Sequence, residues 1–420
     1  MDEEETPKIK ISCKDLWKVF GPDPEHAIKL VKKGMTKEKV LERTGHVIAV
    51  KDASLDVYEG EIFVVMGLSG SGKSTLARCL NRLIEPTRGQ ILIDEVNIGA
   101  MNAAELRQLR RHKMSMVFQT FALFPHRSVI DNAAYGLEIQ GVGKAERHKK
   151  AQEVLKLVGL KGWENSYIHE LSGGMQQRVG LARAFAVDPE ILLMDEPFSA
   201  LDPLIRRQLQ DEFLNLMAEV QKTIVFITHD LNEALKLGSR IAIMKDGEIV
   251  QLGTPEEIVS VPADDYVTEF VRDVPKAKVV PVKNVMREPE VTLYSWQGPK
   301  VALHDMRASG TQYAFIMDPG RRLRGLITAD EAKQAIKDGV TRLSKAAIKD
   351  SIQIGGDQLL EDLIPLSAST TDPVAVVDEN GRLIGEVRHT DVLLGIAGEE
   401  SSSDEESSKE DDSNNTEKQS

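Results

Sequence analysis

The stretch that most constrains this chain is GLSGSGKST, residues 67–75, which directly follows the apolar run EIFVVM. Glycines and small hydroxyl residues pack a core poorly, but they let the backbone turn so that successive N–H groups point inward and can bind an anion. The residues that follow, STLARCLNRLI, have the spacing of an amphipathic helix. A strand, a glycine loop and a helix in this order predict an α/β domain with the loop at the carboxyl end of a buried strand.

The loop fits the pattern G-x-x-x-x-G-K-[ST], which predicts a site for a nucleotide polyphosphate. Lys73 is expected to reach the β- and γ-phosphates, and the Ser74 hydroxyl to ligate Mg²⁺. A flexible glycine turn is the alternative, but its place between a strand and a helix favours nucleotide binding. The predicted phosphate-binding residues are Gly67, Ser69, Gly70, Ser71, Gly72, Lys73, Ser74 and Thr75.

A second apolar run, ILLMDEP at residues 191–197, ends in two carboxylates. Since the carboxyl ends of parallel strands meet at one edge of a sheet, Asp195 and Glu196 are expected beside the phosphate loop. Asp195 would then hold Mg²⁺, and Glu196 would orient or deprotonate the attacking water. The alternative is an acidic strand end that faces solvent, but together with the loop the pair indicates nucleotide hydrolysis.

Composition excludes several classes of function. The chain has 420 residues, enough for two or three domains, and a net charge of −13. Residues 399–420 hold nine acids and two bases, which gives this segment a net charge of −7. The rest of the chain has no excess of basic residues, so its charge does not indicate a nucleic-acid partner. Cys13 and Cys79 are expected to be free thiols. No apolar run reaches the roughly 18 residues of a membrane helix, and the acidic first ten residues resemble no export signal.

The chain divides into three regions. Strand-like and helix-like runs alternate over residues 1–275, which predicts a largely parallel sheet. Residues 276–398 contain an internal repeat of about 60 residues, in which YAFIMDPGRRLRGLITADEAKQAI matches PVAVVDENGRLIGEVRHTDVLLGI. Residues 399–420 contain no aliphatic or aromatic side chain, and we expect this tail to be disordered.

A third motif, LSGGMQQR at residues 171–178, resembles the signature LSGGQ of the nucleotide-binding subunits of ABC transporters, with Met175 in the fifth position. The resemblance spans nearly all of residues 10–260. It implies that Gln119 is the Q-loop glutamine, which would also contact Mg²⁺. Residues 199–202, which end at Asp202, resemble the D-loop, and His229 resembles the switch histidine that senses the γ-phosphate.

The resemblance implies a P-loop ABC ATPase domain at residues 1–275, with a RecA-like core and a helical subdomain at about 120–180. It also implies a homodimer, because in this family two chains dock head to tail. The backbone of Ser172, Gly173 and Gly174 in one chain then completes the ATP site of the other. The expected ligands are ATP and Mg²⁺, and the implied catalytic residues are Glu196, His229 and Lys73.

The aromatic residue that stacks on adenine is expected at the end of the strand DLWKVFG. Phe20 is our candidate, with Trp17 and Tyr58 as alternatives, and a purely core role for Phe20 is also open. Residues 21–47 then form an insertion. Its stretch HAIKLVKKGMTKEKVLERTG could be an amphipathic helix at the membrane partner or a solvated surface helix.

Several stretches, including NRLIEPTRGQILID and LSGGMQQRVGLARA, resemble the ATPase subunits of glycine betaine/proline betaine importers. This resemblance implies osmolyte uptake with a transmembrane permease subunit and a substrate-binding protein, and a peripheral location at the cytoplasmic face of the inner membrane. Another cargo, such as choline, is the alternative. A soluble ABC ATPase that acts on ribosomes or DNA is disfavoured, since this chain has one cassette and about 100 residues between the phosphate loop and LSGG.

The repeat resembles a tandem pair of CBS domains, at residues 276–337 and 338–398. Such pairs often bind adenine nucleotides through a T-x-x-D-like motif, but Thr328 is followed by Glu331, and Asp391 is preceded by Arg388. A ribose-binding site is therefore disfavoured. Three interpretations stay open: a regulatory nucleotide such as a cyclic dinucleotide, electrostatic sensing of ionic strength, and a structural dimerisation module.

Overall fold

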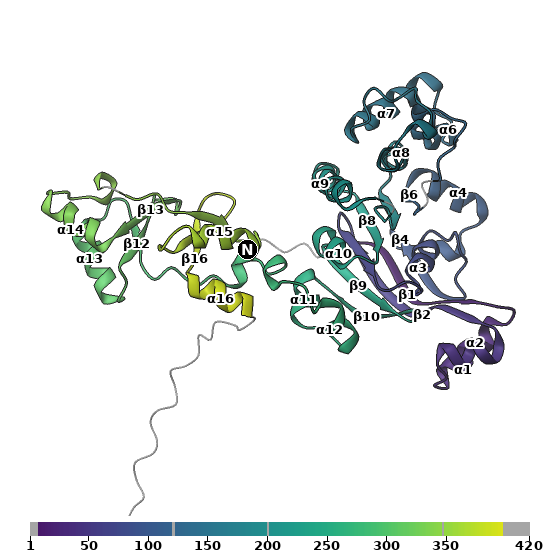
Figure 1. Cartoon of the computed structure of the whole chain (residues 1–420), viewed down its shortest axis with the longest axis horizontal. Coiled ribbons are helices and arrows are strands. Elements are labelled where there is room, and N and C mark those ends of the chain that lie inside the picture. Colours follow the sequence, from purple (N-terminus) through teal and green to yellow (C-terminus); the bar gives the residue numbers. More distant parts are fainter. Residues whose placement is uncertain (1–6, 120–121, 200, 347, 398–420) are drawn as a thin grey trace, which may run out of the picture. The chain divides into compact units, whose positions relative to one another are not determined.

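The computed structural model describes residues 7–119, 122–199, 201–346 and 348–397. The chain forms two compact units, Met1–Arg272 and Asp273–Ser420, which are described separately below (Figure 1). The division lies close to residue 275, where the alternating strand-like and helix-like runs of the sequence end and the internal repeat begins. The acidic tail at 399–420 lies outside the described residues.

The first unit contains a six-stranded sheet in the order β10-β9-β3-β8-β7-β6. Neighbouring strands from β9 to β6 pair in parallel, and only β10 is antiparallel to its neighbour. Every residue of β7 and β8 is buried, as expected for strands covered on both faces. The predicted parallel α/β sheet is thus confirmed. Its strands are β3 (Ile62–Met66), β6 (Met114–Val117), β7 (Ile191–Asp195), β8 (Thr223–Thr228), β9 (Arg240–Lys245) and β10 (Glu248–Gly253).

An antiparallel sheet in the order β2-β1-β4-β5 accompanies it. Its strands are β1 (Ile9–Phe20), β2 (Val47–Tyr58), β4 (Arg88–Ile93) and β5 (Val96–Asn97). β1 and β2 form a long hairpin whose register runs from Ile9 opposite Tyr58 to Phe20 opposite Val47. The chain therefore leaves the sheet after Phe20 and returns to it at Val47, so the two ends of the predicted insertion lie next to each other.

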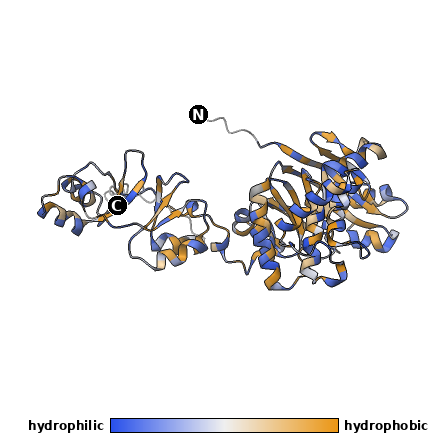
Figure 2. Ribbon diagram, turned by 90° about the horizontal axis from the view of Figure 1, so that it is seen from above, coloured by the Kyte–Doolittle hydropathy of each residue, from blue (hydrophilic) through white to orange (hydrophobic). Residues whose placement is uncertain are grey.

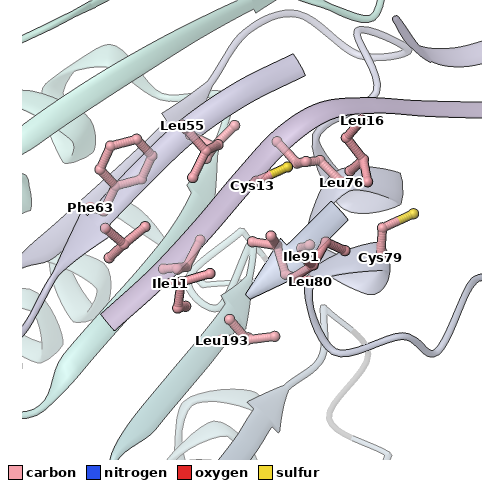
Figure 3. Close-up of a cluster of buried hydrophobic side chains, with 14 of the residues drawn as sticks. Ile11, Cys13, Leu16, Leu55, Phe63, Leu76, Cys79, Leu80, Ile91 and Leu193 are labelled. Carbon is pink, nitrogen blue, oxygen red and sulfur yellow. The ribbon is translucent and has the colours of Figure 1, made fainter. Parts of the chain in front are cut away.

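The main core of this unit lies between the two sheets (Figure 3). It combines Ile11 of β1, Leu55 of β2, Phe63 of β3 and Leu193 of β7, which approach from both sheets, with the buried face of helix α3 (Lys73–Leu80). Cys13 and Cys79 belong to this core as free thiols, and burial raises their pKa to about 12 and about 11, so both stay protonated.

Helices surround the six-stranded sheet. Helices α5, α7 and α8 pack against one another within the stretch where the helical subdomain is expected, and Figure 1 shows α7 and α8 in one cluster with α6. Apart from α3 and the helices of the insertion, the helices of the unit are α4 (Ala103–His112), α5 (Val129–Ala133), α6 (Tyr135–Ile139), α7 (Lys144–Leu157), α8 (Gly173–Phe185), α9 (Pro203–Val220), α10 (Leu231–Leu237), α11 (Pro255–Ser260) and α12 (Asp265–Val271), with 3₁₀ turns η1 (Ile98–Ala100) and η2 (Ile168–Glu170).

The insertion folds into two helices rather than one, α1 (Pro24–Lys32) and α2 (Lys37–Thr44). Ile28 and Val40 are fully buried in a small separate core with Trp17 of β1 and Ile48 of β2. These two apolar residues therefore pack within the chain and are not available to a membrane partner.

The second unit contains two three-stranded sheets, β11-β12-β13 and β14-β15-β16. In both, the first strand pairs in parallel with the second, and the second pairs antiparallel with the third. Phe315 and Leu326 of one sheet pack with Ala375 and Leu383 of the other. The elements are η3 (Lys276–Lys278), η4 (Val282–Asn284), β11 (Thr292–Tyr294), α13 (Pro299–Ala308), β12 (Tyr313–Met317), β13 (Leu323–Thr328), α14 (Ala329–Lys337), η5 (Leu343–Lys345), β14 (Gln353–Gly355), α15 (Leu360–Ala368), β15 (Val374–Val377), β16 (Leu383–Val387) and α16 (His389–Ala397).

The helices of both units carry hydrophilic and hydrophobic residues side by side (Figure 2). Within the part of the chain that the structure describes, no helix has the length and apolar character needed to span a membrane.

Candidate active site

The glycine loop lies between β3 and α3, as the sequence predicts. Gly67 and Gly72 have φ angles of +148° and +104°. A Cβ at Gly67 would lie 2.2 Å from the carbonyl oxygen of Met244, and one at Gly72 would lie 2.1 Å from that of Ala49. Only glycine fits these two positions, because the neighbouring strands approach the loop too closely for any side chain.

Lys73 is held inside the loop. Its Nζ donates to the carbonyl oxygens of Gly67 at 2.7 Å and Leu68 at 3.0 Å. Burial lowers the pKa of this lysine, and the carboxylates of Glu196 and Asp195 act in the opposite direction. An anionic ligand in the loop would favour the charged ammonium further. The buried Ser71 hydroxyl has no protein partner among the described residues, so the loop also contains a free polar group.

Asp195 ends β7 and is almost fully buried beside the start of α3. Its Oδ1 accepts a hydrogen bond from Ser74 Oγ at 2.8 Å, and its Oδ2 lies 3.3 Å from the guanidinium of Arg78. A hydroxyl and a carboxylate at this separation are the oxygen ligands that Mg²⁺ prefers, with the remaining positions left to water and phosphate. The residues present therefore fit Mg²⁺. No cluster of three or more His, Cys, Asp or Glu side chains that could hold a metal is found among the described residues.

Glu196 contacts two other predicted site residues, Gln119 and His229. Its Oε2 accepts from Gln119 Nε2 at 3.1 Å and lies 3.2 Å from His229 Nδ1. The backbone of Glu196 has a φ of +49°, a conformation uncommon for a side chain of this size, and its N–H donates to Ile227 of β8 at 3.0 Å. This local conformation, secured by the neighbouring strand, turns the carboxylate toward the glutamine and the histidine.

Most of these groups share one pocket of about 740 Å³. Gln119, Glu196 and His229 line it together with Phe20, which is 42% exposed. The loop contributes Leu68, Ser69, Gly70, Gly72, Lys73, Ser74 and Thr75, whereas Gly67, Ser71 and Asp195 do not line it. Neither alternative aromatic residue lines this pocket. Trp17 is buried and donates from Nε1 to Asp52 at 3.1 Å, and Tyr58 packs under the guanidinium of Arg240 at 4.7 Å. Of the three candidates, only Phe20 therefore lines this pocket.

Residues 50–199 match the sequence family described as ABC transporter. The chain is 49% identical over 391 residues to the glycine betaine/carnitine transport ATP-binding protein GbuA of Listeria monocytogenes, a match that covers 93% of this chain and 98% of that protein. It is also 49% identical to the glycine betaine/proline betaine transport system ATP-binding protein ProV of Salmonella typhimurium, over 90% of this chain and 95% of that protein. The chain is an ABC transporter ATP-binding subunit.

The ABC assignment agrees with the fold. A solved dimeric, post-hydrolysis structure of the ATP-binding cassette MJ0796 bound to ADP and Pi is 33% identical to this chain. It superposes with a TM-score of 0.50 and covers 58% of this chain and 98% of the cassette. The chain is therefore an ATPase, and the pocket around Lys73 is the candidate site for ATP.

The signature residues lie elsewhere in this ABC ATPase. Ser172, Gly173, Gly174 and Asp202 line a separate pocket of about 550 Å³, which shares no described residue with the first. Ser172 caps α8 by accepting a hydrogen bond from the N–H of Met175 at 3.4 Å, and Asp202 caps α9. Within one chain the structure does not bring the signature to the phosphate loop.

Sequence reasoning missed part of the ATP pocket. Lys37, Glu38 and Leu41 of α2, together with residues 46–49, also line it. No motif marks them. The available signal was that the predicted insertion begins directly after Phe20, so its first residues must lie next to the predicted aromatic residue.

The arrangement at Ser74 leads to a first prediction. Replacing Ser74 by alanine removes a hydroxyl that donates to Asp195 and that we expect to ligate Mg²⁺. We expect the Mg²⁺ concentration for half-maximal ATP hydrolysis to rise by roughly tenfold or more. A Mg²⁺ titration of ATPase activity measures this, with Ser260→Ala at an exposed helix end as the control. An unchanged Mg²⁺ dependence in Ser74→Ala would remove Ser74 from the metal site.

Proposed function

We propose that this ABC ATPase energises the uptake of quaternary-ammonium compatible solutes of the glycine betaine/proline betaine type. The observation that carries the proposal is the 49% identity to GbuA and ProV over at least 90% of this chain and 95% of each relative. Similarity of this extent includes the second unit as well as the ATPase. Osmolyte uptake under osmotic stress is the corresponding role.

We infer the following roles for the residues of the ATP pocket. The loop amides and Lys73 bind the phosphates, and Phe20 packs on the adenine. Ser74, Asp195 and Gln119 hold Mg²⁺, which when bound would neutralise charge on the phosphates. Glu196 accepts a proton from the attacking water, and His229, whose Nδ1 lies 3.2 Å from the same carboxylate, senses the γ-phosphate.

The proposed assembly is a homodimer that works with a transmembrane permease and, through it, a substrate-binding protein. The location of Ser172–Gly174 in a pocket of its own supports a site completed by a second copy, since among the described residues this pocket shares none with the pocket of the phosphate loop. Such an ATPase would act as a peripheral subunit on the cytoplasmic side of the cell membrane.

We also propose that the second unit is a tandem CBS pair that regulates the ATPase. Both acids at the ribose-binding positions are already engaged within the chain. Glu331 accepts from the N–H of Thr328 at 2.7 Å, and the buried Asp391 pairs with Arg287 and accepts from the N–H of Arg388 at 2.8 Å. These contacts argue against a ribose-type site and leave another nucleotide, or ionic strength, as the regulatory signal.

Uptake by the reconstituted complex tests the cargo. The permease complex is assembled with this chain in vesicles, and ATP-dependent uptake of glycine betaine, proline betaine, carnitine and choline is compared at low and high salt. We expect the two betaines to be taken up best and their uptake to rise with salt. Uptake of choline alone would reassign the cargo while leaving the ATPase in place.

A further inference from the structure

The ATP pocket has two chemically different ends. One end contains the phosphate loop, Lys73 and Glu196. The other, formed by the end of the β-hairpin and by α2, contains large apolar side chains that remain substantially exposed: Phe20 at 42%, Leu41 at 48% and Val47 at 47%. Exposed apolar groups gathered on one concave surface indicate a ligand with a matching apolar part. A purine nucleotide has such a part, a flat base, at the end opposite its phosphates.

Two of these apolar residues are paired across the β-hairpin. Phe20 ends β1 and Val47 begins β2, and the two stand directly opposite each other. Their side chains therefore lie next to one another at the position where the insertion leaves the sheet. Because the predicted adenine contact is one member of this pair, any element built on the hairpin end adjoins the base.

Leu41 comes from that element. On α2 it lies four residues after Lys37, on the same face of the helix, and both residues line the pocket. The adjacent Val40 is fully buried in the small core below the insertion. Since Val40 anchors one face of α2, Leu41 is presented on the face that adjoins the nucleotide site.

Several contacts hold the insertion in a fixed position at one side of the pocket. The N–H of Asp23 donates to Nε2 of the buried His46 at 3.0 Å, which ties its first residues to its last. Glu25 of α1 pairs with Arg88 of β4, and Lys37 of α2 pairs with Asp246 between β9 and β10. With its own core and ion pairs to β4 and to the turn between β9 and β10, the two-helix element is held beside the loop before any nucleotide binds.

We propose that the inserted helix α2 is part of the nucleotide site, and that Leu41 packs on the adenine base together with Phe20. This inference deepens the proposed role of Phe20 and extends the base-binding surface beyond the strand to the insertion. The contact is apolar, so it contributes to binding of the base and leaves the phosphates and the attacking water unaffected. Leu41 thus sets nucleotide affinity rather than the rate of hydrolysis.

Binding of two ligands to the full chain tests the inference: ADP, which has a base, and inorganic tripolyphosphate, which has none. For Leu41→Ala we expect ADP binding to weaken by roughly 3- to 30-fold, because part of an apolar contact is lost, with tripolyphosphate binding unchanged. Leu41→Met should restore most of the affinity. In steady-state hydrolysis, KM for ATP should rise while kcat stays within about twofold.

Leu83→Ala is the matched control, since Leu83 has the same 48% exposure as Leu41 but does not line the pocket. It should change neither affinity. Unchanged ADP binding in Leu41→Ala would overturn the proposal, and so would an equal loss of ADP and tripolyphosphate binding. Phe20→Ala is measured in parallel. If Phe20→Ala binds ADP normally, the proposed contact between Phe20 and adenine is wrong. The result for Leu41→Ala still decides whether the insertion contributes to the site.

Discussion

Replacing Glu196 by glutamine should abolish steady-state ATP hydrolysis while ATP still binds. The carboxylate contacts Gln119 and His229 and is the group that we expect to take a proton from water, and glutamine keeps its shape without its basicity. Loss of a general base typically costs on the order of 10²–10⁴-fold in rate. The amide can still form hydrogen bonds, so the pocket should keep its geometry.

Three measurements check this expectation: phosphate release, ATP affinity, and the mass of the protein with ATP. In Glu196→Gln, phosphate release should fall to background, and the affinity for ATP should match that of the unchanged chain. The mass measured with ATP should be that of a dimer, and this dimer should persist. Glu153→Gln, on the exposed surface of α7, is the control and should behave like the unchanged chain. Hydrolysis at the normal rate in Glu196→Gln would mean that another group activates the water.

Local motifs predicted the chemical groups of the site because each one fixes its own backbone. The glycine loop could be recognised since Gly67 and Gly72 occupy positions that no other residue can. The Asp195–Glu196 pair could be placed because strand ends in a parallel sheet lie at one edge. In both cases the chemistry and the conformation are encoded within a few adjacent residues.

The choice between Phe20 and Trp17 could not be made in this way. β1 contains register shifts on both sides of Leu16, and Asp15 has a φ of +50°. As a result Leu16 and Trp17, although adjacent, are both buried, and the alternation of inward and outward side chains is interrupted. Which aromatic residue faces the pocket depends on this irregularity, and periodicity does not reveal it.

The base end of the pocket was missed for a related reason. Leu41 lies in a stretch whose charges and apolar residues suit any surface helix, so its sequence does not say what it adjoins. Its position follows from long-range contacts: the Phe20–Val47 pairing, the buried Val40 and the ion pair between Lys37 and Asp246. Pockets lined by residues far apart in sequence depend on such contacts, and a single sequence does not display them.

Lesions placed in two different chains should complement each other if the ATP site is shared. Gly173→Asp introduces a negative charge at the signature, where a partner's γ-phosphate is expected, and so should prevent closure. A Cβ at Gly173 meets no atom within 4 Å, so the fold should tolerate the change. Gly143→Asp, at the equally open start of α7, is the control and should remain active.

A dimer of one Glu196→Gln chain and one Gly173→Asp chain shows whether each ATP site is shared between two chains or formed within one chain. In a head-to-tail dimer, one site combines Glu196 of the second chain with the intact signature of the first, so up to roughly half of the normal hydrolysis should remain. Both changes in one chain, paired with an unchanged chain, should leave no intact site. Heterodimers purified through two different tags allow the comparison. If each chain hydrolysed ATP with its own signature, the result would be reversed: the first dimer would be inactive and the second would retain activity.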